Sequence, residues 1–245
     1  MTIALHAVEG LPEIRPGDDL GALVAKRAPD IRRGDVVVVA QKVVSKAEGR
    51  LRELATVSVS QQARKVATPL AADPRLVQLV LDESVRIVRQ ERVLIVETRQ
   101  GFICANAGID RSNLDGNDMV SLLPLDCDLS ARHLRERMTA LAGADVAVII
   151  SDTFGRPWRL GLTNVALGVA GAPALIDYRG HLDDFGRPLR ATLVALADDI
   201  AAAAGLIMGK TQRVPAVIVR GLQPFEDRPG SGQDLIRQRE LDLFR

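Results

Sequence analysis

The sequence of 245 residues predicts a mixed α/β (α+β) fold in a single domain that spans residues 1–245. Short runs rich in Val and Ile, each of strand length, alternate with stretches in which Leu, Val and Ala recur at spacings of three and four residues. No Pro/Ser-rich linker and no low-complexity tract separates these segments. The pattern therefore indicates sheets and helices with no obvious domain boundary, and 245 residues are compatible with one large domain or with two tightly joined lobes.

The expected elements follow from these two patterns. Strands are expected at residues 3–8, 35–40, 86–91, 93–98, 102–106, 146–151, 174–176 and 216–219. Helices are expected at residues 19–26, 60–70, 73–84, 130–142 and 190–206, the last of them capped by Gly205. Residues 179–190 and 225–233 carry Gly, Pro and charge, and are expected to be loops.

One hexamer pattern, Asp-x-Phe-Gly-Arg-Pro, occurs at residues 152–157 and again at residues 183–188. The residues that flank the two copies do not correspond, so the pattern does not indicate a duplicated structural unit. We expect two polar loops that face one cleft.

The composition argues against nucleic-acid, secreted and membrane proteins. The 32 basic and 31 acidic residues nearly cancel, and aromatic residues make up only 3%, which leaves little material for stacking on bases. No apolar run approaches the roughly 20 residues that a membrane helix needs, and the N-terminus lacks the pattern of a signal peptide. Cys104 and Cys127 lie far apart and form no zinc-type motif, which is typical of a reducing compartment. We therefore expect a cytoplasmic protein with no nucleic-acid or membrane partner.

Two carboxylates follow apolar strands and form a candidate metal site. Asp110 lies with Asn113 in a glycine-containing loop, and Asp152 with Thr153 follows the apolar residues 146–151. Oxygen ligands of this kind suit Mg²⁺ or Mn²⁺ better than zinc, and ligands gather at strand ends in α/β sheets. On spacing alone the favoured alternative is that Asp110 caps a turn and Asp152 caps the next helix.

Residues 41–50 form a candidate phosphate-binding segment. Ser45, Lys46 and Arg50 come just after the strand at 35–40, where hydroxyl and cationic groups can hold a triphosphate. The alternative is the start of a helix with solvated Lys and Arg side chains.

Several familiar motifs are absent. Residues 205–211 end in Gly-Lys-Thr, but the two glycines are separated by three residues instead of the four of a Walker A loop, and a helix precedes them. The acidic run at 110–118 does not fit an EF-hand, and the three histidines form no His-Glu-x-x-His pair. No Gly-x-Gly-x-x-Gly fingerprint occurs either, so a P-loop, a dinucleotide fold and serine- or zinc-type hydrolysis are not supported.

Five segments, taken together and in order, resemble the coenzyme F420-0:γ-glutamyl ligase family over essentially the whole chain. They read LPEI, QKVVSKAEGR, ANAGIDRSN, SDTFGRPWRLGLTNVALG and VPAVIVRG. The resemblance implies two interwoven α/β lobes in an intimate homodimer, with nucleotide and substrate in the cleft between the lobes. It also implies that GTP phosphorylates the terminal carboxylate of coenzyme F420-0, that L-glutamate attacks the acyl phosphate, and that a further glutamate can be joined by a γ-linkage.

The resemblance implies roles for individual residues, with two divalent ions (Mg²⁺ or Mn²⁺), K⁺ and GTP as the partners of the site. Asp110 and Asp152 are similar to catalytic residues that ligate one divalent ion, and Thr153 is similar to a ligand of the second. Lys210 departs from the pattern, because some members have an acidic metal ligand there; it is expected to pair with phosphate instead. The nucleotide-binding candidates are Leu11, Pro12, Glu13, Ile14, Ser45, Lys46, Arg50, Asn113 and, within the stretch 208–215, Met208, Gly209 and Lys210.

Two alternatives to the F420-0 ligase remain open on these residues. The metal and nucleotide positions do not specify the acceptor, so a related amide ligase acting on another carboxylate fits them as well. A deazaflavin- or nucleotide-binding protein that keeps the fold without turnover is the non-enzymatic alternative.

Overall fold

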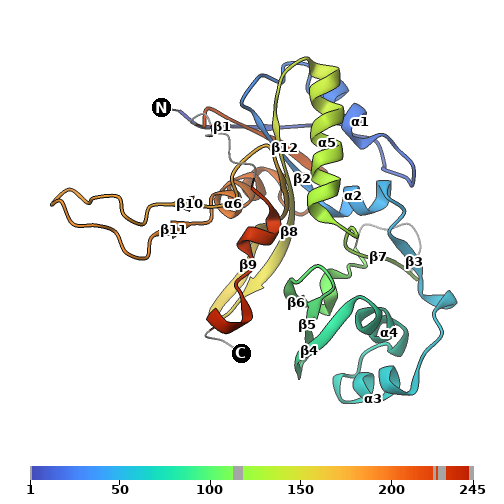
Figure 1. Ribbon diagram of the computed structural model, residues 1–245. Helices are drawn as coiled ribbons and strands as arrows, with labels where there is room; N and C mark the ends of the chain where they lie inside the picture. Colours follow the sequence, from blue (N-terminus) through green and yellow to red (C-terminus); the bar gives the residue numbers. More distant parts are fainter. Residues whose placement is uncertain (1, 113–117, 223–224, 226–229, 243–245) are drawn as a thin grey trace.

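A five-stranded sheet forms the centre of the computed structural model, which describes residues 2–112, 118–222, 225 and 230–242. The strand order is β1 (Ala4–Ala7), β12 (Ala216–Arg220), β2 (Val36–Ala40), β8 (Ala147–Arg156) and β9 (Arg159–Ala170). β2 and β8 are parallel, and the other neighbours in this sheet are antiparallel. Figure 1 shows the sheet running through the middle of the molecule.

Both faces of this sheet are covered by helices, which explains why β2 is a continuous run of buried Val. Val37 and Val39 pack in the core beneath α1 (Leu20–Arg27), α2 (Gln41–Ala47) and α5 (Cys127–Ala142). Val36 and Val38 point the other way, into the core shared with α6 (Leu196–Met208). A strand that is buried on both faces needs apolar residues at successive positions, because neighbouring side chains alternate between the faces.

A smaller unit with its own hydrophobic core is inserted between β3 (Leu51–Glu53) and β7 (Met119–Ser121), which pair with each other. It contains a sheet of β4 (Ser84–Glu91), β5 (Val93–Thr98) and β6 (Ile103–Ala105), packed against α3 (Gln61–Leu70) and α4 (Pro74–Asp82). Figure 1 shows this unit below the central sheet. The chain therefore has two parts, each with a sheet and helices.

The helices begin where the sequence offers side-chain caps. Asp19, Ser60, Asp73 and Asp126 each accept a hydrogen bond from a backbone amide in the first turn of α1, α3, α4 and α5. α5 ends at Gly143, whose φ of 65° lies in the left-handed region that glycine tolerates.

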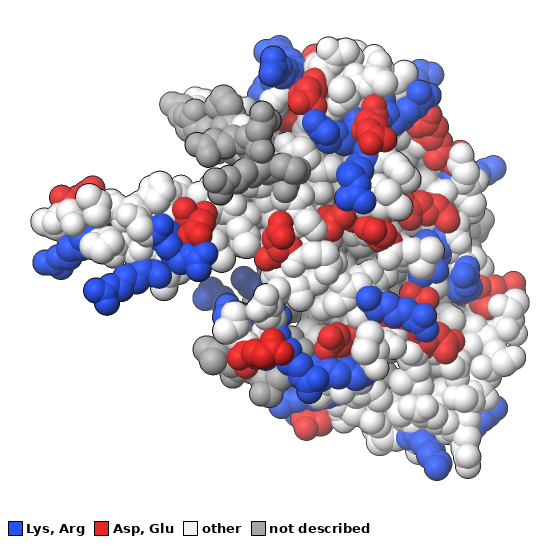
Figure 2. Space-filling model, viewed as in Figure 1, with Lys and Arg blue, Asp and Glu red and all other residues white. Residues whose placement is uncertain are grey.

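A long arm leaves the body between β10 (Ile176–Asp177) and β11 (Leu193–Val194), which pair at its base. Figures 1 and 2 show the arm projecting from the molecule, with basic side chains along one edge. The other elements among the described residues are four short 3-10 helices: η1 (Leu54–Thr56), η2 (Asn106–Gly108), η3 (Gly232–Leu235) and η4 (Arg239–Leu241). No helix in the described ranges is both long enough and apolar enough to cross a membrane.

The structure confirms the mixed α/β class and corrects three expectations. β8 continues past Asp152 to Arg156 and pairs with β9, a strand that the sequence patterns did not predict, so Asp152 caps no helix. α6 starts at Leu196, after β11, and its cap is Gly209; Gly205 lies inside the helix. The first copy of the hexamer lies in β8 and the following turn, and the second lies in the arm, so they are not two loops facing one cleft.

Candidate functional site

The candidate site lies where the parallel strands β2 and β8 end side by side. Ala40, the last residue of β2, is paired with Ser151 in β8. Beyond this point the two chains part, because β2 turns directly into α2 whereas β8 continues as a strand. Lys42 and Asp152 therefore follow the same pair of strand ends, the edge at which open α/β sheets collect polar ligands.

Asp110 reaches this edge from the smaller unit, and its backbone is fixed to β7. Its amide donates to the Ser121 carbonyl at 3.1 Å, and the Ser121 amide donates back at 2.9 Å. The Asp110 side chain accepts from the Ser112 amide at 2.7 Å, the turn-capping role expected on spacing, and its Oδ2 accepts from Lys42 Nζ at 2.6 Å. Burial works to raise the pKa of Asp110, but the hydrogen bonds from Lys42 and Ser112 outweigh it and hold the pKa below its usual value.

Asp152 has the opposite electrostatic balance. Burial raises its pKa to about 6, a hydrogen bond from the Thr153 amide at 2.7 Å works against this, and the negative charge of Asp110 adds to the rise. Lys210 and Lys42 lower it through their charges. The charges of Asp110 and Asp152 thus interact, although the two residues come from different units of the fold and are 42 residues apart in the sequence.

Thr153 already has a cationic neighbour. Lys210 Nζ donates to Thr153 Oγ1 at 2.5 Å, and Thr153 Oγ1 donates to Asn164 Oδ1 at 3.1 Å. Lys210 sits just after Gly209, whose φ of 53° and ψ of −152° end α6 and turn the chain back towards β8. Thr153, the expected ligand of the second metal ion, and Lys210 are therefore in direct contact.

Two of the expected nucleotide-binding segments also meet. Glu13 forms an ion pair with Lys46, which is buried in α2, and Ile14 is buried in the same core as the apolar face of that helix. Leu11 packs against this core, whereas Pro12 and Glu13 are exposed. Residues 11–14 thus form a surface loop anchored on α2.

Ser45 and Arg50 are buried and bonded to the protein. Ser45 donates to the Leu122 carbonyl at 2.6 Å, and Arg50 donates to the Leu123 carbonyl at 2.8 Å and to Glu83 at 2.7 Å. These bonds fasten α2 and its C-terminal turn to the chain that leaves β7 and to the smaller unit. Their role in nucleotide binding stays a prediction, and Asn113 lies outside the described residues.

The site contains two residues that sequence analysis did not single out. Lys42 belongs to the 41–50 segment but was passed over in favour of Lys46, and only the structure shows that it reaches Asp110. Asn164 lies in the unpredicted strand β9, directly opposite Thr153 in the register. A prediction of a strand after the turn at Pro157 would have placed Asn164 beside Thr153.

The donor chemistry fits a divalent ion that prefers oxygen. Asp110 and Asp152 offer carboxylates and Thr153 a hydroxyl near the ends of β2 and β8, and Asp152 has only the Thr153 amide as a hydrogen-bond partner of its side chain within the described residues. No group of three or more His, Cys, Asp or Glu side chains that could hold a metal occurs in that part of the chain. Mg²⁺ and Mn²⁺ are commonly held by one or two carboxylates, with water and substrate phosphates completing the shell. Such an ion fits these residues, whereas a closed protein cage for zinc does not.

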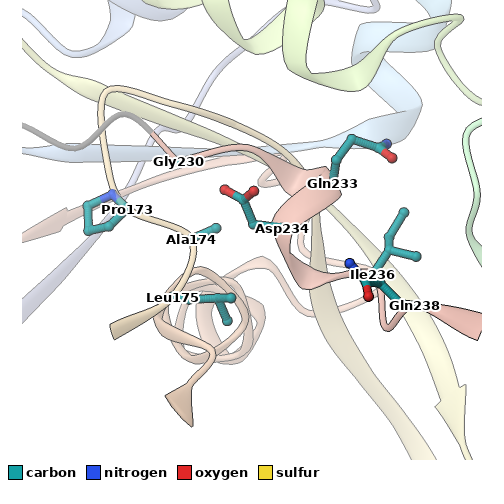
Figure 3. A pocket seen from close by; sticks show the side chains of 8 residues that line it. All are labelled: Pro173, Ala174, Leu175, Gly230, Gln233, Asp234, Ile236 and Gln238. Atoms are coloured by element: carbon teal, nitrogen blue, oxygen red, sulfur yellow. The ribbon is translucent and has the colours of Figure 1, made fainter. Parts of the chain in front are cut away.

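Two shallow pockets lie apart from these groups. One, of about 450 Å³, is lined by residues 173–175 and by Gly230, Gln233, Asp234, Ile236 and Gln238, and Figure 3 shows their side chains around it. The other, of about 270 Å³, is mostly apolar and includes Phe154, two residues beyond Asp152, and Val165, the register partner of Asp152. None of the expected site residues lines either pocket.

Comparison with known proteins identifies the family of the chain. Residues 10–221 match the family described as F420-0:Gamma-glutamyl ligase. A coenzyme F420:L-glutamate ligase of Methanopyrus kandleri is 45% identical over 100% of this chain and 98% of its own length. Proteins of the same name from Methanothermobacter thermautotrophicus and Archaeoglobus fulgidus are 44% and 42% identical, each over 100% of this chain and over 100% and 97% of their own lengths. The chain therefore belongs to the F420-0:γ-glutamyl ligase family and is a ligase.

Proposed function

We propose that this ligase uses GTP to join L-glutamate to the terminal carboxylate of coenzyme F420-0. We also propose that it can join a further glutamate to the γ-carboxyl group of the first. A carboxylate oxygen of the acceptor attacks the γ-phosphorus of GTP, the bond to the β-phosphate oxygen breaks, and GDP leaves. The glutamate amine then attacks the acyl carbon, the bond to the phosphate oxygen breaks, and phosphate and a proton are released. The names of the relatives support the ligation of glutamate, and the chemistry of the site supports the phosphate steps.

The single observation that carries this proposal is that the ion pair with Lys42 holds Asp110 beside the ends of β2 and β8, where Asp152 directly follows Ser151. Burial raises the pKa of Asp152 and the negative charge of Asp110 adds to this rise, so a cation shared by the two carboxylates would stabilise their charges. Mg²⁺ or Mn²⁺ bound there would neutralise and align the phosphates of GTP. In this proposal Asp110 and Asp152 ligate the first ion.

The second ion and the nucleotide contacts belong to the same proposal. Thr153 is assigned to the second divalent ion and Lys210, whose ammonium group lies beside it, to the phosphates. A lysine is a mobile point charge that suits phosphate contacts. The loop 11–14 and residues 45, 46, 50, 113, 208 and 209 are assigned to GTP, and K⁺ is assigned to the site by family resemblance alone.

We further propose that the protein acts in the cytoplasm as an intertwined homodimer. Large apolar side chains are exposed on the β8–β9 hairpin and on the arm, among them Leu160 at 99% and Phe185 at 85% exposure. Apolar side chains gathered on projecting segments are typical of surfaces that another chain covers. Both cysteines are buried and free, in keeping with a reducing compartment.

The test is mass spectrometry of coenzyme F420-0 incubated with the protein, GTP, Mn²⁺ and L-glutamate. The wild-type protein should add one or more glutamate residues, and Asp152→Asn should add none. Asp145→Asn is the matched control, because Asp145 lies just before the opposite end of β8 and pairs on the surface with Arg135. A wild-type protein that binds GTP but leaves the mass of F420-0 unchanged would contradict the proposal; other carboxylate acceptors would then be screened.

A further inference from the structure

Lys42 is bonded directly to one of the two candidate carboxylate ligands of the first metal ion. It is the second residue of α2, directly beyond the end of β2, and its Nζ lies 2.6 Å from Asp110 Oδ2. The same ammonium donates to the Ser112 carbonyl at 2.9 Å and to Ser112 Oγ at 2.5 Å. Its side chain is 19% exposed, so the stem is largely covered while the charged end remains at the site.

Lys42 also acts on the second carboxylate. Its positive charge lowers the pKa of Asp152, as does that of Lys210 on the other side. The two lysines come from different elements, Lys42 from α2 and Lys210 from the turn after α6. Lys42 therefore occupies an oxygen atom of Asp110 that another cation would need, whereas Lys42 and Lys210 act on Asp152 through their charge alone.

A divalent ion bound to Asp110 would disrupt the ion pair between Asp110 and Lys42. Asp110 Oδ2 is the acceptor of the Lys42 bond, and a metal ion at this oxygen would repel the ammonium group. The four-carbon stem of lysine allows the charged end to swing without moving the helix. Phosphate oxygens bound to that ion would be the nearest new acceptors for the displaced ammonium.

We propose that Lys42 is a phosphate-binding residue that holds Asp110 until a divalent ion binds, and then transfers its ammonium group to the nucleotide phosphates. The inference rests on the proposed metal- and GTP-dependent function. It assigns Lys42 two opposite effects: it weakens the binding of the metal ion alone and strengthens the binding of the metal–nucleotide complex. Metal and nucleotide binding are thereby coupled through one side chain.

The experiment measures Mn²⁺ binding by the electron paramagnetic resonance signal of the free ion, with and without a non-hydrolysable GTP analogue. Lys42→Met should bind Mn²⁺ alone about threefold more tightly, because the competing ion pair is lost. The same variant should bind the Mn²⁺–analogue complex about tenfold more weakly, because a charged hydrogen bond to phosphate is lost. Lys42→Arg should keep affinities for both close to those of the wild type, and Lys65→Met, a change on the exposed side of α3, is the matched control.

The outcomes separate this inference from the function on which it rests. If Lys42→Met weakens Mn²⁺ alone and the complex equally, while thermal unfolding shows an intact fold, Lys42 only props the loop at Asp110 and the inference is wrong. Unchanged affinities would likewise overturn it. If the wild-type protein binds no Mn²⁺ with or without the analogue, both the proposed function and this inference fail.

Discussion

Replacing Asp152 by Asn should make the protein more stable while abolishing ligation. Asn has nearly the same shape and its side-chain oxygen can still accept the hydrogen bond from the Thr153 amide, which is 2.7 Å from Asp152 Oδ1. The substitution removes only the charge, which burial and the neighbouring Asp110 make unfavourable in the folded protein. The carboxylate of Asp152 serves ligation, and its charge lowers the free energy of unfolding.

The size of the effect follows from the pKa of Asp152. A rise from 3.8 to about 6 corresponds to about 3 kcal/mol at neutral pH, and partial contact with solvent reduces this to about 1–3 kcal/mol. The pKa of Asp152 is higher in the folded than in the unfolded protein. The free energy of unfolding of the wild-type protein therefore falls by this amount as the pH rises from about 4 to about 6. The stability advantage of Asp152→Asn should therefore grow across that range and stay constant above it.

The assay is urea unfolding followed by circular dichroism between pH 2 and pH 8, with EDTA present to remove divalent ions. Asp110→Asn is the matched control with the opposite sign, because the pKa of Asp110 is lowered and the charge is favourable. That variant should be less stable than the wild type at neutral pH, and the difference should shrink below about pH 4. A destabilised Asp152→Asn protein, or a difference that does not change with pH, would refute the electrostatic reasoning.

Two further predictions concern buried polar groups that hold the site in place. Asp128→Ala should cost about 2–4 kcal/mol of unfolding free energy in urea titrations, because its carboxylate accepts bonds from the amides of Val169 and Gly232 and from Ser231 Oγ; a loss below about 1 kcal/mol would contradict this. Arg50→Met and Glu83→Gln should each lower the free energy of unfolding by about 1–3 kcal/mol, with a coupling of about 1 kcal/mol in a double-mutant cycle. If Arg50 also contacts GTP, calorimetry should show weaker GTP binding for Arg50→Met and unchanged binding for Glu83→Gln.

The central sheet was predictable because burial on both faces leaves a simple signal. The continuous Val run of β2 and the apolar start of β8 marked two strands, and Ser60 and Asp73 marked two helix starts where the structure has them. β9 was missed because its first half mixes charged, glycine and apolar residues, as in Arg159, Leu160 and Gly161, and follows no regular pattern of buried positions. Long hairpins of this kind depend on pairing with a neighbour, which local sequence does not record.

The site was predictable in its residue types but not in its contacts. Asp110 and Asp152 follow apolar strands, so their position at a sheet edge could be expected, whereas the approach of the smaller unit that delivers Asp110 could not. The pairing of Lys42 with Asp110 spans 68 residues and depends on that approach. For Ser45 and Arg50 the sequence indicated polar groups for a ligand, and the structure shows that the same groups also bond α2 to the rest of the protein.

The two halves of β8 explain how a charge with a raised pKa is held in place. Ala147 to Ile150 is buried on both faces and anchors the strand in the central cores, while the residues from Asp152 onward become progressively exposed in the hairpin with β9. Asp152 lies at the boundary, where solvent is scarce enough to strengthen electrostatic interactions yet an ion can still enter. A carboxylate two residues earlier would be sealed in the core, and one three residues later, at the exposed Gly155, would be hydrated and weakly coupled to Asp110. The position of the change from buried to exposed strand therefore fixes the place of the site along β8.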